Sequence, residues 1–209
     1  MSHIARNRGL ILKTFLYQVV MSFFGVMMYL ATYRNAALFV IGQTAVILFY
    51  FYIFFSQSMQ AGSKECEYGF AHKEEKSSPW FGLLPVFLGF LPMIVLSLWN
   101  VFLPPYQASG EPGSIFAFGP FELNKVLQQG VFEGIYQVLF PTVSGDSGVA
   151  AENAAALNAQ ARVFPFAFLP GWIAGSAGFA FGWFRFRGSG KNAKAASDDK
   201  TDEKEDEKE

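Results

Sequence analysis

Residues 170–182, Pro-Gly-Trp-Ile-Ala-Gly-Ser-Ala-Gly-Phe-Ala-Phe-Gly, form an uncharged and apolar stretch that is rich in small residues. Its glycines are Gly171, Gly175, Gly178 and Gly182, and on a helix this spacing places all four along one stripe. In water, so much glycine would weaken a helix by up to about 1 kcal/mol per residue. In lipid the backbone must bond to itself, and a glycine stripe lets a second helix approach closely. The stretch therefore predicts a membrane helix with a packing face.

The composition of the chain also favours a membrane protein. Of the 209 residues, 52% are hydrophobic and 16% are charged, and the charged share lies below the ~25% that is usual in soluble domains. Much of the charge is gathered in residues 191–209, which contain five lysines and eight acidic residues. The single cysteine, Cys66, excludes an intramolecular disulfide.

Four apolar stretches reach the length of about 20 residues that a membrane-spanning helix needs. The first, 10–30, carries one charge, Lys13, near its start, and no clear cleavage site follows it, which favours an uncleaved span over a signal peptide. The second, 36–55, has no charge and follows after a short polar break, so the two predict an antiparallel hairpin. The third and fourth are 80–102 and 163–184. The sequence thus predicts an all-α integral membrane protein with four transmembrane helices.

Glycine and proline alternate in the third span as Gly82, Pro85, Gly89 and Pro92. A proline inside a helix removes a hydrogen bond and crowds the preceding turn, so we expect kinks at Pro85 and Pro92 and helix packing at the two glycines. In the fourth span we expect a third kink, at Pro170, because the part that begins there is too short to cross the hydrocarbon alone.

The remaining segments are expected to lie outside the hydrocarbon. They are an N-terminus over 1–9, a polar loop over 56–79, a long loop over 103–162 and a charged, disordered tail over 185–209. Within the long loop, 121–140 has the pattern of an amphipathic helix. This helix either lies on the bilayer surface or caps the ends of the spans.

The distribution of Lys and Arg predicts the orientation, because cytoplasmic segments carry an excess of both. The side that holds both termini and the 56–79 loop has ten of them near the spans: Arg6, Arg8, Lys13, Lys64, Lys73, Lys76, Arg185, Arg187, Lys191 and Lys194. The opposite side has three, namely Arg34, Lys125 and Arg162. We therefore expect a cell-membrane protein with both termini and the 56–79 loop in the cytoplasm, and with an extracytoplasmic 103–162 loop.

One short motif resembles a catalytic sequence. Gly145-Asp146-Ser147-Gly148 matches the residues around the nucleophile of chymotrypsin-like proteases, but that chemistry needs a histidine base. The predicted topology places both histidines, His3 and His72, across the membrane from Ser147, so a turn before a helix is the preferred interpretation. The sequence shows no phosphate-binding glycine loop, paired-cysteine motif or nucleic-acid surface. We accordingly expect no cofactor, no metal site and no nucleic-acid partner.

The predicted spans contain polar side chains but no Asp or Glu. Gln18, Gln43 and Asn100 stand out among them, and such residues bond helices together or line a weakly polar path. We therefore expect a non-enzymatic accessory, scaffold or assembly subunit whose helices bind other membrane helices, from a second copy or a different protein, within the lipid bilayer. The alternative is a membrane subunit of a transporter or a small channel, which the bent third span and the split fourth span favour.

Overall fold

The computed structural model describes residues 3–71, 77–107, 114–141 and 151–206, and these form helices and no strands. Four helical segments are long and apolar enough to cross a membrane, namely Arg8–Thr32, Ala36–Ala71, Pro79–Phe102 and Asn153–Arg187. The prediction of an all-helical chain with four candidate spans is therefore confirmed over the described residues.

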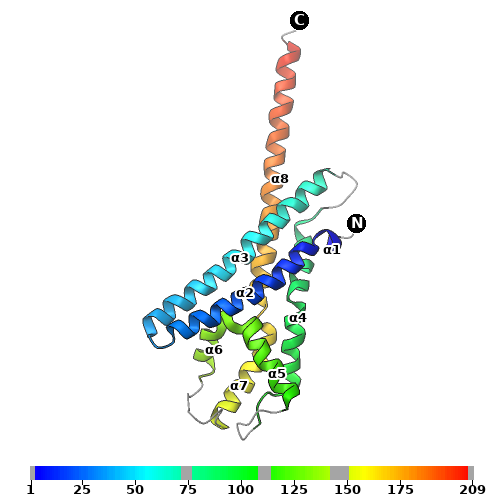
Figure 1. Cartoon of the computed structure of the whole chain (residues 1–209). Helices are drawn as coiled ribbons and strands as arrows, with labels where there is room; N and C mark the ends of the chain where they lie inside the picture. The colour runs from blue at the N-terminus through cyan, green and yellow to red at the C-terminus, as the bar shows by residue number, and fades with distance from the viewer. Residues whose placement is uncertain (1–2, 72–76, 108–113, 142–150, 207–209) are drawn as a thin grey trace.

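The N-terminal part is a helical hairpin (Figure 1). A short helix, α1 (His3–Arg6), precedes α2 (Arg8–Thr32), and α3 (Ala36–Ala71) runs back alongside α2. The side chain of Asn35 caps the start of α3, because its Oδ1 accepts hydrogen bonds from the amides of Ala37 (3.1 Å) and Leu38 (3.2 Å). The hairpin between the first two spans thus has a defined turn.

Helix α3 is longer than the apolar stretch that predicts it. Its 36 residues amount to about 54 Å of helix, whereas the hydrocarbon of a bilayer is about 30 Å thick. The predicted polar loop over 56–79 is therefore wrong for 56–71, while 72–76 lie outside the described residues. The helix continues because Ser58, Gly62, Glu65 and Cys66 are buried along one face of it. The hydropathy of a sequence indicates which part of a helix can lie in lipid, but it does not indicate where the helix ends.

The second half of the bundle contains α4 (Leu83–Phe102), which follows the short helix η1 (Pro79–Gly82), and α8 (Leu169–Asp206). Pro92 lies inside α4, whereas Pro85 lies in its first turn. A proline in the first turn removes no hydrogen bond within its own α-helix. The kinks expected at Pro85 and Pro92 remain predictions.

The fourth candidate span is broken into two helices. Helix α7 (Ala151–Val163) is followed by a short turn of 3₁₀-helix, η4 (Phe164–Phe166), and α8 begins three residues later. Pro170 is the second residue of α8, so the break lies just before it. Beyond Arg187, α8 projects away from the bundle (Figure 1). The disorder expected for 185–209 remains a prediction.

The sequence pattern predicts one amphipathic helix over 121–140. The described residues between α4 and α7 instead form four short helical elements. These are α5 (Ile115–Asn124), a turn of π-helix, η2 (Lys125–Gln129), a turn of 3₁₀-helix, η3 (Gly130–Phe132), and α6 (Glu133–Leu139). The turns η2 and η3 pack on α2, and Gly130, Val131 and Phe132 are buried. Of the two positions considered for this segment, the structure shows packing against the spans.

Candidate functional site

A groove lies between the first half of α3 and helix α6. Its volume is about 260 Å³, and its walls are apolar. Helix α3 contributes Phe39, Val40, Thr44 and Ile47, and helix α6 contributes Ile135, Val138 and Leu139. Several of these side chains are well exposed, with Val138 reaching 71%. The groove therefore presents an apolar surface at the end of the bundle where α6 meets the α2–α3 hairpin.

Two polar side chains, Gln43 and Thr44, line this otherwise apolar groove, and Gln43 carries the only side-chain amide among the described residues that line it. It is only 6% exposed, and neither its Oε1 nor its Nε2 has a hydrogen-bond partner in the part of the chain that the structure describes. Gly134 makes room for it, because a β-carbon at position 134 would lie 2.6 Å from Gln43 Cγ. A buried polar group without a partner costs about 1–3 kcal/mol. The Gln43 amide is thus an unsatisfied hydrogen-bonding group buried in the wall of the groove.

The other two predicted intramembrane polar residues differ in their contacts. Gln18 is buried, and its Oε1 accepts a hydrogen bond of 2.8 Å from the hydroxyl of Tyr50, which joins α2 to α3. Asn100 is buried near the end of α4, and its amide has no hydrogen-bond partner within the described ranges. Gln18 therefore holds the bundle together, whereas Gln43 and Asn100 do not do so through side-chain hydrogen bonds.

A buried carboxylate, Glu133, lies at the start of α6 and is 3% exposed. Its Oε1 is 3.3 Å from Lys125 Nζ and accepts a hydrogen bond of 2.9 Å from the amide of Gln137. Burial raises the pKa of the nearby Tyr136, and the negative charge of Glu133 raises it further. Glu133 falls on the polar side of the amphipathic pattern over 121–140, and that pattern does not predict its burial.

The six predicted packing glycines lie against other parts of the same chain. Gly178 and Gly182 lie against the backbone carbonyls of Phe55 and Met59 in α3, and Gly175 lies against the side chain of Val86. In the same way, Gly171 lies against Tyr50, Gly82 against Phe179 and Gly89 against Thr14. The glycine stripe of α8 is thus covered by α3 and α4 and leaves little surface for an outside helix.

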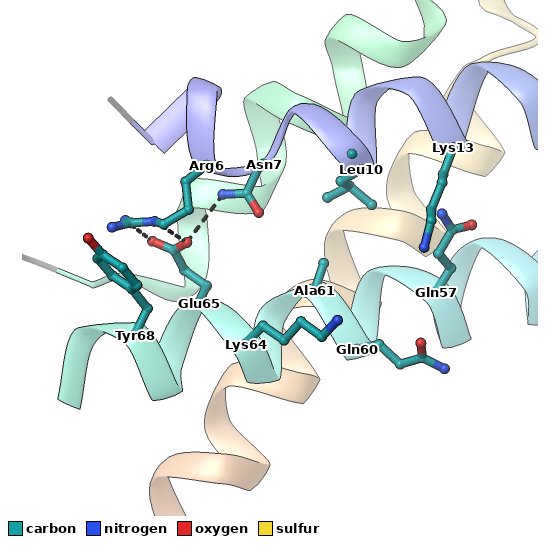
Figure 2. Close-up of a pocket in the computed structure, with 11 residues that line it drawn as sticks. Arg6, Asn7, Leu10, Lys13, Gln57, Gln60, Ala61, Lys64, Glu65 and Tyr68 are labelled. Atoms are coloured by element: carbon teal, nitrogen blue, oxygen red, sulfur yellow. Dashed lines mark hydrogen bonds and ion pairs between the residues drawn. The ribbon is translucent and has the colours of Figure 1, made fainter. Parts of the chain in front are cut away.

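A polar pocket of about 350 Å³ lies at the other end of the hairpin, between the start of α2 and the second half of α3 (Figure 2). At one end of it the guanidinium of Arg6 donates to Glu65, with 2.9 Å from Nε to Oε2, and forms an ion pair with it through Nη2. Asn7 Nδ2 also donates to Glu65 at 3.2 Å. The Arg6 guanidinium lies 4.2 Å from the ring centre of Tyr68. Glu65, 2% exposed, thus anchors α1 to α3.

Sequence reasoning missed this pocket, because it treated residues from 56 onward as a loop. The signal that was available is the spacing of Gln57, Gln60, Ala61, Lys64, Glu65 and Tyr68, which is that of one helical face.

The protease-like motif at 145–148 lies outside the described residues. Within the described ranges, no group of three His, Cys, Asp or Glu side chains is placed to hold a metal ion. Comparison with protein-family models, with curated proteins and with solved structures finds no match to this chain.

Proposed function

We propose that the chain is a non-enzymatic accessory or assembly subunit of a membrane, which binds a partner membrane helix in the groove between α3 and α6. One observation carries the proposal: Gln43 is buried on an apolar groove with both of its amide atoms unpartnered over the described residues. The partner is a helix with an apolar surface and an amide or hydroxyl side chain, from a second copy or from a different protein.

The chemistry of Gln43 favours a helix over a lipid as the occupant. An acyl chain fills an apolar groove but offers no hydrogen bond, so the amide would remain unsatisfied. A polar side chain on a partner helix satisfies it, and hydrogen bonds of this kind between membrane helices contribute about 0.6–2 kcal/mol. The apolar walls of the groove supply the packing surface that helix association in lipid requires.

The packing of the remaining bundle supports a scaffold. The glycines of α8 lie against α3 and α4 of the same chain, and Gln18 is bonded to Tyr50. These contacts fix the positions of the spans and therefore the shape of the groove, so a partner helix meets a preformed surface.

Site-directed photo-crosslinking in native membranes tests the proposal. A photoreactive residue at Val138, on the groove, is expected to form a protein adduct, while one at Val20, which is 60% exposed on α2, is not. The adduct is expected to disappear in the Gln43→Leu variant and to persist in Gln60→Leu, the same substitution farther along α3. Its mass distinguishes a second copy from another protein. Adducts with lipid alone, or a protein adduct that Gln43→Leu leaves unchanged, would contradict the proposal.

A transporter subunit or small channel is the second candidate, and buried Glu133 favours it. Ionisable side chains buried among membrane helices often line ion or substrate paths, and the charge of Glu133 is paired with Lys125 at 3.3 Å. Uptake or conductance in proteoliposomes that falls on substitution of Gln18, Gln43 or Glu133 would support this candidate over the scaffold.

We also propose that the protein lies in the cell membrane with both termini and the second half of α3 on the cytoplasmic side. The excess of Lys and Arg on that side supports this orientation. It places the groove toward the extracytoplasmic side and the polar pocket at the cytoplasmic end of the hairpin.

A further inference from the structure

We propose that the pocket between the start of α2 and the second half of α3 binds a phosphate-bearing anion. The proposal concerns the opposite end of the hairpin from the groove and does not depend on the function proposed above. It rests on the charges of the pocket, on a buried donor that lines it, and on the contact that holds its walls.

The pocket carries more positive than negative charge. Arg6, Lys13, Lys64 and Glu65 line it, and only Arg6 is paired with the carboxylate. Lys13 and Lys64 have no ion-pair partner among the described residues, and both are exposed. Two positive charges therefore remain in excess, and they match the charge of a phosphate group near neutral pH.

The lysines approach the cavity from different helices. Figure 2 shows Lys13 extending from α2 toward α3 and Lys64 lying along α3, and both line the cavity. An ammonium group is a compact charge with three donors and a flexible stem, which suits phosphate binding from two sides.

A neutral donor adds an independent indication of a ligand. Gln57 lines the same pocket, and its Nε2 is buried without a hydrogen-bond partner in the described part of the chain. Figure 2 shows the amide of Gln57 beside the side chain of Lys13, so the unpartnered donor and one of the two lysines lie together in the pocket. With an anion bound there, the amide would no longer be a buried donor without an acceptor.

The far wall of the pocket is fixed by buried contacts. Glu65 holds Arg6 and Asn7, and Arg6 lies over Tyr68. This cluster joins α1 to α3 and holds this wall of the pocket in place. The pocket is therefore largely preformed, which lowers the entropy cost of binding a ligand. The volume of about 350 Å³ falls within the range of roughly 300–1,000 Å³ that is usual for small-ligand sites.

Two sources can supply this chemistry, namely the head group of an anionic phospholipid and a soluble phosphate or phosphate ester. The full-length protein, purified in a neutral detergent, is titrated with phosphatidylglycerol, with phosphatidylcholine and with inorganic phosphate. Native mass spectrometry counts bound lipid, and thermal unfolding reports stabilisation by either ligand. Preference for phosphatidylglycerol identifies a lipid site, and stabilisation by phosphate at constant ionic strength identifies a soluble anion. Each result supports the proposal.

Matched variants distinguish binding in this pocket from a general attraction of anions to the positively charged surface. Lys13→Gln/Lys64→Gln is expected to weaken binding by roughly tenfold or more, because it removes two charged donors. Arg8→Gln/Arg185→Gln removes two exposed charges that do not line the pocket, and it is expected to bind like the unmodified chain. Lys13→Arg/Lys64→Arg keeps the charges and is expected to retain most of the affinity. Equal weakening by both Gln pairs, or no discrimination between the two lipids together with no response to phosphate, would overturn the proposal.

Discussion

The amide nitrogen of Gly130 donates a hydrogen bond of 2.8 Å to the hydroxyl oxygen of Ser22. The same hydroxyl donates to the carbonyl oxygen of Val126, also at 2.8 Å. Gly130 begins η3, where the regular hydrogen bonding of the 115–139 segment changes from one helix type to another. Backbone groups at such a break need other partners, and the α2 side chain supplies them. One serine thus anchors the broken segment to the hairpin.

We predict that Ser22→Ala lowers the free energy of unfolding by about 1–3 kcal/mol, because it leaves the buried amide of Gly130 and the part-buried carbonyl of Val126 without this partner. Thermal unfolding of the purified protein in detergent measures the change. Ser56→Ala in α3 is the matched control, since Ser56 makes no side-chain hydrogen bond within the described ranges. Equal melting temperatures for the two variants would show that the Ser22 bonds add nothing.

The α3–α8 contact predicts a graded response to added methyl groups. Gly178→Ala is expected to destabilise the bundle strongly, because the new β-carbon would collide with the Phe55 carbonyl, which is backbone and cannot rotate away. Gly175→Ala is expected to cost less, since its β-carbon would meet side-chain atoms of Val86 at 2.8 Å and Ser58 at 3.2 Å. Overpacking of this kind typically costs about 1–3 kcal/mol.

Gly9→Ala is the control for this series, because Gly9 is exposed on α2 and nothing lies within 4 Å of a β-carbon at that position. It is expected to be neutral or slightly stabilising, as alanine is the better helix former. Thermal unfolding of the three variants should follow the order Gly178→Ala, Gly175→Ala, Gly9→Ala, from the least to the most stable. A different order would mean that α3 and α8 are not in the close contact described.

The apolar stretches indicate the candidate spans well, because length and hydropathy are properties that lipid itself requires. The end of α3 could not be predicted in this way. Its residues from Ser56 onward mix polar and apolar types, and they stay helical because α8 and Arg6 of α1 pack against one face of them. Glu133 illustrates a second limit, since periodicity places it on a polar face. It becomes buried only because η2 and η3 break the helix and change which side chains face α2.

The groove and the pocket show how a site can escape sequence analysis. Gln43 is visible in the sequence as a polar residue in an apolar span, but its lack of a partner depends on where α6 packs. The pocket needs α1, α2 and α3 together, and Lys13 is separated from Lys64 by the whole hairpin turn. Such sites depend on tertiary contacts that neither hydropathy nor local spacing contains.

A titration of Tyr106 tests its burial and its contact with Glu122. Burial, the charge of Glu122 and a hydrogen bond to that carboxylate raise the pKa of Tyr106 from 10.0 to about 12. Folding therefore favours the neutral phenol, so this contribution to stability is complete below about pH 10 and is lost as the pH rises through about 12. The tyrosinate absorbance of the protein minus that of Tyr106→Phe should give the pKa, and Glu122→Gln should lower it. An unchanged pKa in Glu122→Gln would contradict the described contact.

The proposed orientation predicts where α3 can be labelled from outside the cell. Ala36 and Glu67 are exposed near opposite ends of α3, about 46 Å apart along the helix. A membrane-impermeant maleimide is expected to label Ala36→Cys in intact cells, and Glu67→Cys only after the cells are opened. The native Cys66, which is buried, serves as the internal control, because it should stay unlabelled until the protein is denatured. The reverse pattern would invert the orientation, and equal labelling of both positions in intact cells would mean that α3 does not cross the membrane.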